Sequence, residues 1–139
     1  MTVSQAIIKW LKTFKPENLP HMKQIDTELM HGDVDYALVK EPVTNVRHFI
    51  SGTEMHKDHY QIMARLASQT NSDCEDNGEW LEALTEWIDQ KNRAGEYPEL
   101  ERATVKRIGI STPFHMGSTG QGESLYQMTI YIEYIKEGE

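Results

Sequence analysis

Hydrophobic residues near the start of the chain recur at intervals of three and four, the spacing that places them on one face of an α-helix. These positions are Val3, Ala6, Ile7, Trp10, Leu11 and Phe14. Thr2 or Ser4 can cap this helix, and Pro16 ends it because the residue before a proline avoids helical angles. The pattern therefore predicts a short amphipathic helix at the N-terminus.

A second and longer apolar stripe lies in the middle of the chain and consists of Trp80, Leu81, Leu84, Trp87 and Ile88. Acidic residues precede or open this segment, where negative charge favours a helix N-terminus. Gly95 fits the C-cap position, and Pro98 prevents the helix from continuing. We expect a helix between about Asp73 and Gly95.

Four segments have strand-like patterns. Residues 35–42 (DYALVKEP) predict a strand that Pro42 stops, and residues 45–50 (NVRHFI) alternate before a turn at residues 51–53. Residues 104–113 (TVKRIGISTP) and 126–134 (YQMTIYIEY) predict two strands near the C-terminus. The last segment has one apolar and one mixed face, which is typical of an antiparallel sheet covered on one side.

Residues 55–67 fit two patterns. Tyr60, Ile62, Ala64 and Leu66 alternate as in a strand, whereas His59, Ile62, Met63 and Leu66 share one face of a helix. Periodicity alone leaves both possibilities open. In either case the order of helix, strands, helix and strands predicts one α+β domain over residues 1–139, an antiparallel sheet flanked by an N-terminal helix and a longer acidic helix.

The net charge of −8 is concentrated in one segment. From Asp73 to Glu101 there are ten acidic and two basic residues, which accounts for the whole excess. No block of Lys or Arg offers a surface for phosphate backbones, so sequence-specific nucleic-acid binding is not expected. Within this segment four carboxylates form a helical stripe, Glu79, Glu82, Glu86 and Asp89. The stripe is either an ordinary solvated face or a surface that meets a basic partner or repels DNA.

The glycines of residues 117–122 (GSTGQG) raise the question of a phosphate-binding loop. Such a loop follows a strand and opens a helix, whereas here a strand follows and the lysine of a Walker motif is absent. We interpret Gly117, Gly120 and Gly122 as a long hairpin connection that can carry contacts to a partner.

The candidate chemical residues form no assembled catalytic group. His56 and His59 would share a face only on a helix, and a metal site there would need a third ligand such as Asp33, Asp35 or Asp58. The possible nucleophiles lie in no known signature; they are Ser51, Ser111, Ser118 and Cys74. We therefore predict no catalytic, cofactor-binding or metal-binding residues and no enzyme activity.

The single cysteine, Cys74, excludes an internal disulfide. Lys9 and Lys12 interrupt the apolar residues of the N-terminus, so it does not match a secretory signal. No apolar run approaches the roughly 20 residues that span a bilayer. We expect a protein made in the cytoplasm, without a membrane partner.

The complete pattern resembles the small tailed-bacteriophage proteins known as minor capsid proteins and regarded as tail terminators. The resemblance extends over nearly the whole chain, from "IIKWLKTF" and "DYALVKEP" through "HYQIMARL" and "WIDQKNRAGEYP" to "VKRIGISTP" and "YQMTIYIEY". It rests on this overall pattern, because the family has no short diagnostic motif.

The resemblance implies a structural virion protein that forms a ring, usually of six copies, at the head–tail junction. The ring caps the tail tube, so its partners are copies of the same chain and other tail or head-connector proteins, in the host cytoplasm and then in the virion. The resemblance favours a strand over residues 55–67 and supplies no catalytic or cofactor residues. It also suggests that the acidic stripe lines the bore and that the glycine loop docks on the tube or the head.

Two other functions stay open at the level of sequence. A small acidic protein that mimics the charge of DNA, such as a nuclease inhibitor, would also carry an acidic stripe. A metal-dependent enzyme that uses His56 and His59 is the third possibility.

Overall fold

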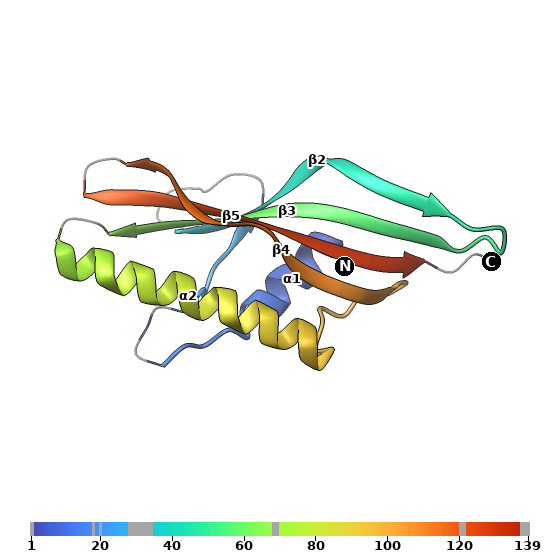
Figure 1. The fold of residues 1–139 in the computed structure, drawn as a ribbon, viewed down its shortest axis with the longest axis horizontal. Coiled ribbons are helices and arrows are strands. Elements are labelled where there is room, and N and C mark those ends of the chain that lie inside the picture. The colour runs from blue at the N-terminus through green and yellow to red at the C-terminus, as the bar shows by residue number, and fades with distance from the viewer. Residues whose placement is uncertain are drawn as a thin grey trace.

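The computed structural model describes residues 2–17, 19, 21–27, 35–67, 70–119 and 122–136, and within these residues it has two helices and five strands (Figure 1). In chain order they are α1 (Val3–Leu11), β1 (Asp26–Thr27), β2 (Tyr36–His48), β3 (Glu54–Ala67), α2 (Asn71–Ala94), β4 (Thr104–Thr119) and β5 (Glu123–Lys136). The α+β class predicted from the sequence is confirmed.

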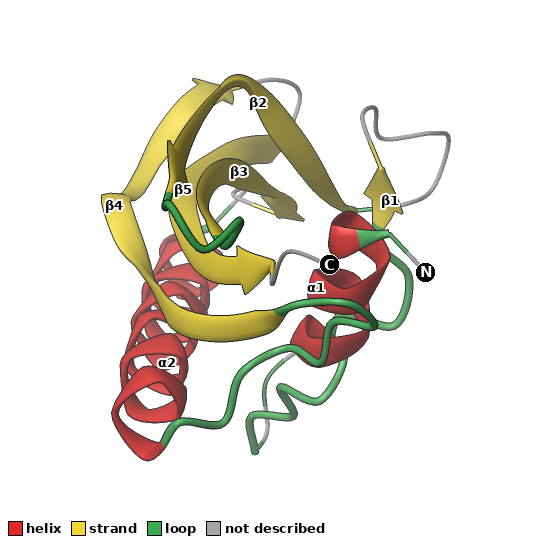
Figure 2. Ribbon diagram, turned by 90° about the vertical axis from the view of Figure 1, so that its right-hand side faces the viewer, coloured by secondary structure: helices red, strands yellow, loops and turns green. Residues whose placement is uncertain are grey.

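The five strands form one sheet in the order β1-β2-β3-β5-β4. The pairs β2–β3, β3–β5 and β4–β5 are antiparallel, whereas β1 and β2 are parallel. The sheet is therefore antiparallel, as predicted, except for this one short parallel pair. In Figure 2 the sheet is strongly curled and both helices lie against the same side of it.

Each helix begins with a capping box. The Thr2 hydroxyl accepts a hydrogen bond from the Gln5 amide, and the Gln5 side chain accepts one from the Thr2 amide. Thr70 and Asp73 repeat this arrangement at the start of α2. These reciprocal bonds satisfy two amides that have no partner within the helix. Gly95 ends α2 in the left-handed conformation, with φ of 71°, as its C-cap position predicts.

The core lies between the helices and the inward face of the sheet. α1 contributes Ile7 and Leu11, and α2 contributes Trp80, Leu84 and Ile88, all of which are almost completely buried. The sheet contributes Tyr60, Ile62, Ile108, Met128, Ile130 and Ile132. Aromatic rings connect the layers, because Trp10 packs 4.5 Å from Trp87 and Trp80 stacks on Tyr36 at 5.6 Å between ring centroids.

Residues 55–67 form a strand, β3, and not a helix. Alternate side chains from Asp58 to Leu66 are buried, while those between them are partly exposed. β3 is bonded to β2 on one side and to β5 on the other, so both of its backbone edges are satisfied. This long-range pairing resolves the ambiguity that the local pattern leaves.

Neither Pro42 nor Pro113 ends its strand, which contradicts the sequence-based expectation. β2 continues to His48 and β4 continues to Thr119. Both prolines lie at irregularities, where the β2–β3 register shifts between Lys40 and Thr44 and the β4–β5 register shifts between Thr112 and His115. A proline is tolerated at such a bulge because its missing amide hydrogen is not needed for the ladder.

Candidate functional site

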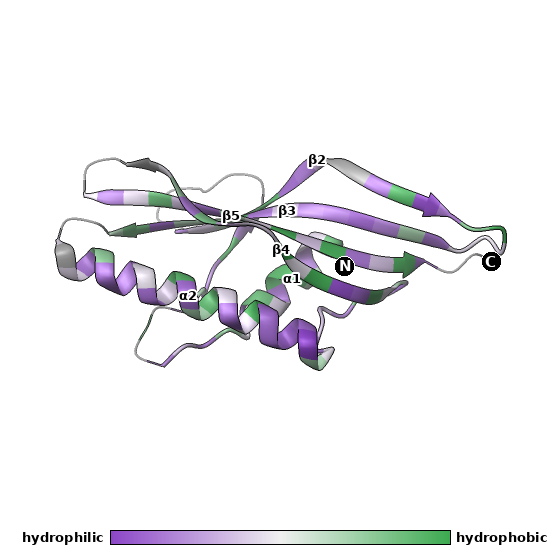
Figure 3. Cartoon of the chain, in the orientation of Figure 1, coloured by the Kyte–Doolittle hydropathy of each residue, from purple (hydrophilic) through white to green (hydrophobic). Residues whose placement is uncertain are grey.

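The turn between β2 and β3 lies at one end of the long axis of the molecule, beyond the helices (Figure 1). We call residues 45–53 the hairpin tip. Phe49 is 45% exposed and Ile50 is fully exposed, and Val46 on the preceding strand is also exposed. In Figure 3 the turn that follows β2 is green, which marks hydrophobic residues, next to the purple, hydrophilic end of the strand. Large apolar side chains grouped at a projecting turn are typical of a contact surface.

The hairpin tip is an ordered turn. The Phe49 amide donates to the Thr53 carbonyl at 2.9 Å, and the Gly52 amide donates to the Phe49 carbonyl at 3.0 Å. Gly52 has a φ of 89°, a value that glycine adopts without steric cost. The backbone thus holds Ile50 outward at the apex of the turn.

Two histidines hold one carboxylate below the tip. Glu54 lies 3.0 Å from His48 Nδ1 through one oxygen and 3.3 Å from His56 Nε2 through the other. His56 also stacks on Tyr134, with ring centroids 5.1 Å apart and planes within 7° of parallel. This cluster joins β2, β3 and β5 at the base of the tip and engages the only acidic side chain of residues 45–57.

A buried polar pair lies next to this cluster. The Tyr134 hydroxyl donates a 2.8 Å hydrogen bond to Asp58 Oδ2, and Lys40 Nζ lies 4.0 Å from the same oxygen. Burial, followed by the hydrogen bond to Asp58, raises the pKa of Tyr134 well above its ordinary value. Sequence reasoning missed Asp58 as a buried residue. The sequence does contain a sign of this burial, because Asp58 alternates in phase with the buried residues Tyr60, Ile62, Ala64 and Leu66.

All four carboxylates of the predicted stripe on α2 are exposed, namely Glu79, Glu82, Glu86 and Asp89. Beside the stripe, α2 and β4 enclose an open groove with a volume of about 490 Å³. The groove is lined by Gly78, Leu81, Glu82, Thr85, Glu86, Pro113 and Phe114. Sequence reasoning missed it, because the strand was predicted only over residues 104–113 and no local pattern places Pro113 and Phe114 beside α2.

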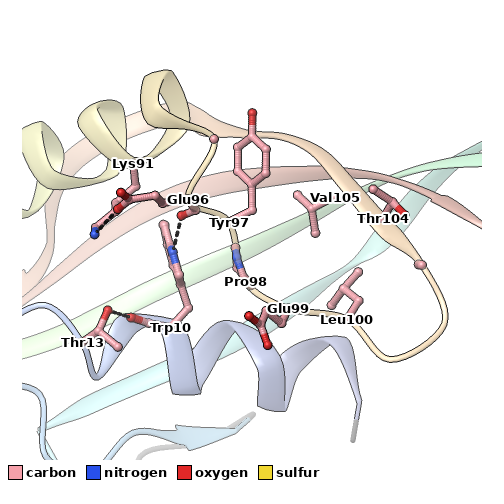
Figure 4. A pocket seen from close by; sticks show the side chains of 12 residues that line it. Trp10, Thr13, Lys91, Glu96, Tyr97, Pro98, Glu99, Leu100, Thr104 and Val105 are labelled. Atoms are coloured by element: carbon pink, nitrogen blue, oxygen red, sulfur yellow. Dashed lines mark hydrogen bonds and ion pairs between the residues drawn. The ribbon is translucent and has the colours of Figure 1, made fainter.

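A larger hollow of about 640 Å³ lies between α1 and the segment after α2 (Figure 4). Its polar groups bond to one another, since Trp10 Nε1 donates to the Glu96 carbonyl at 2.9 Å and Lys91 pairs with the Glu96 carboxylate. Figure 4 shows these contacts around a lining that includes Tyr97 and Leu100. They hold α1 against the end of α2, which is a structural role.

The structure does not bring the two candidate histidine ligands together. His56 contacts Tyr134 and His59 lies beside Tyr131, on opposite faces of β3. Asp35 pairs with Arg65 at 3.4 Å, and Asp33 lies outside the described residues. Within the described ranges, no group of three or more His, Cys, Asp or Glu side chains is arranged to hold a metal ion.

The possible nucleophiles are also separate. Ser51 bonds to Thr53 in the hairpin tip, Ser111 bonds to the Thr129 carbonyl, and Cys74 is exposed in the first turn of α2. Ser118 belongs to β4. Ser111 belongs to β4 as well, so two of the four lie on one strand, seven residues apart, while Ser51 and Cys74 lie on other parts of the chain.

The glycine segment is a shorter connection than the sequence suggested. Gly117 belongs to β4, Gly122 has a φ of 75° before β5, and Gly120 lies outside the described residues. A strand follows the glycines, as predicted, so no helix N-terminus is present to bind a phosphate. A side chain at Gly117 would approach Gln127 Nε2 to 2.5 Å, so the flexible Gln127 side chain would have to move to accommodate it.

No protein-family model matches the chain, and neither does any curated protein. In the part of the chain that the structure covers, neither helix has the length and apolar character of a membrane span.

Proposed function

We propose that the protein is a structural subunit of a tailed-phage virion, a tail terminator or head–tail joining protein that assembles as a ring and caps the tail tube. One observation carries the proposal: an ordered hairpin tip exposes Phe49 and Ile50 at the far end of the sheet. Apolar side chains presented in this way are stabilised when a partner removes them from water. The whole-chain resemblance supplies the identity of the assembly.

The distribution of polar residues supports an assembly role over catalysis. Ser51, Cys74 and Ser111 lie on different segments of the fold, and His56 and His59 are on opposite faces of one strand. A catalytic site needs its groups within hydrogen-bond reach of one another. The described residues contain no such arrangement among these candidates.

Negative-stain imaging of tail tubes incubated with the purified protein tests the proposal. We expect a disc at one end of each tube, and tubes without the protein provide the control. Native mass measurement should give a multiple of the 16.1 kDa chain, with six copies as the expected ring. Bare tube ends at saturating protein would contradict the proposal.

The exposed acidic stripe favours a second candidate, an acidic inhibitor that mimics DNA. A nuclease assay tests it by comparing the natural chain with a variant in which Glu79, Glu82, Glu86 and Asp89 are replaced by their amides. Inhibition by the natural chain alone would support this candidate. Equal nuclease rates with and without the protein would reject it.

A further inference from the structure

We propose that the hairpin tip of one copy docks into the groove between α2 and β4 of the next copy. This contact deepens the proposed ring and rests on that proposed function. It commits the groove to one occupant, a second copy of this chain, because tip and groove complement each other in polarity and in charge.

The apolar parts are complementary. On the tip, Phe49 and Ile50 are exposed large hydrophobic side chains. In the groove, the apolar lining is supplied by Leu81, Pro113 and Phe114. Phe114 packs 6.1 Å from Trp80 between ring centroids, so this lining is anchored to the core. A volume of about 490 Å³ falls within the roughly 300–1,000 Å³ typical of sites that enclose a compact group.

The charges are also complementary. Arg47, two residues before Phe49, is exposed and makes no ion pair with another described residue. The nearby acid, Glu54, is already engaged by His48 and His56. The groove carries Glu82 and Glu86, both exposed. Opposite charges at the rim of an interface steer association and set its register.

The two surfaces lie at different ends of the molecule. In Figure 1 the β2–β3 turn is at one end of the long axis, whereas the N-terminal half of α2 lies toward the other. A contact between two different surfaces is heterologous, and repeating it with a constant rotation produces a closed ring or an open filament. In such an assembly Glu82 and Glu86 face a neighbouring subunit. The basic partner of this part of the acidic stripe is then Arg47 of that subunit.

Sedimentation velocity of purified variants tests this contact. Ile50→Asp places a charge in the apolar groove, so we expect the Kd for self-association to rise at least ~10-fold. Arg47→Glu should weaken association by repulsion from Glu82 and Glu86. Glu82→Arg should weaken it as well, and the double variant Arg47→Glu/Glu82→Arg should regain most of the natural affinity.

Glu79→Arg is the matched control, because Glu79 belongs to the same acidic stripe and does not line the groove. It should associate like the natural chain. Far-UV circular dichroism of each variant shows whether the fold is intact, and the exposed positions of these side chains favour this result. Restoration of assembly by the double variant cannot come from a folding defect.

The results separate this contact from the function on which it rests. If the natural chain caps tail tubes and Ile50→Asp and Arg47→Glu associate normally, the contact is overturned and the function stands. A natural chain that stays monomeric at every concentration also overturns the contact, whereas the imaging of tube ends decides the function independently. Equal weakening by Glu79→Arg would show that general charge, and not the groove, controls assembly.

Discussion

Tyr134 of β5 donates a buried hydrogen bond of 2.8 Å to Asp58 of β3, 76 residues earlier in the chain. Both side chains are less than 5% exposed. The bond lies at the base of the projecting hairpin, next to the stack of His56 on Tyr134. It therefore connects the core of the sheet with the part that carries the hairpin tip.

Removal of the Tyr134 hydroxyl should destabilise the protein. Tyr134→Phe removes the hydroxyl that donates to the Asp58 carboxylate, while Lys40 stays 4.0 Å from the same oxygen. A hydrogen bond to a charged group contributes about 1.5–3 kcal/mol. Urea denaturation of Tyr134→Phe, Asp58→Ala and the double variant measures the coupling between the two residues. Additive losses in free energy would contradict a direct interaction.

Stability should fall at alkaline pH because buried tyrosines must ionise when the chain unfolds. Burial raises the pKa of Tyr134, Tyr60 and Tyr36 above their ordinary value of about 10. The contribution of these neutral tyrosines to folding stability is fully present below pH ~10. It is lost as the pH rises from there toward the folded-state pKa, because in that range the unfolded chain binds fewer protons than the folded chain. Urea midpoints at pH 8 and pH 11 measure the effect.

In that experiment Tyr134→Phe should show a smaller decrease between the two pH values than the natural chain. Tyr126→Phe, at a partly exposed position, serves as the control and should behave like the natural chain. The same decrease in Tyr134→Phe and in the natural chain would show that other groups cause the alkaline loss.

Trp10 should be the residue that attaches α1 to the rest of the domain. Its ring packs 4.5 Å from Trp87 between centroids, and its indole donates to the Glu96 carbonyl. Trp10→Ala should lower the free energy of unfolding by about 3–5 kcal/mol, as for other large buried aromatic residues. Trp10→Phe keeps most of the packing and should lose less. Equal losses in chemical denaturation would assign the effect to the lost hydrogen bond.

Gly109 should be required by the ring that covers it. A side chain there would lie 2.7 Å from the Tyr131 hydroxyl, and this ring is also contacted by Lys57 and Arg107. Gly109→Ala should therefore destabilise the protein by about 1–3 kcal/mol through overpacking. In a Tyr131→Ala background the same substitution should cost less, which thermal denaturation of the four variants can measure.

The two helices were predictable because their signals are local. Apolar residues at helical spacing, capping residues and Gly95 all lie within the segments that they specify. The α+β order followed from these helices and from the alternation between them. The exposure of the acidic stripe was also predictable, since the side of α2 opposite its apolar face must meet solvent.

The remaining features depend on neighbours that are distant in the chain. Residues 55–67 form a strand because β2 and β5 bond to both of its edges. Pro42 and Pro113 are accommodated because the register shifts around them. The groove exists because α2 packs beside β4, which brings Leu81 and Glu82 close to Pro113 and Phe114. Local periodicity carries no information about such pairings, because their free energy arises only when segments far apart in the chain are packed together.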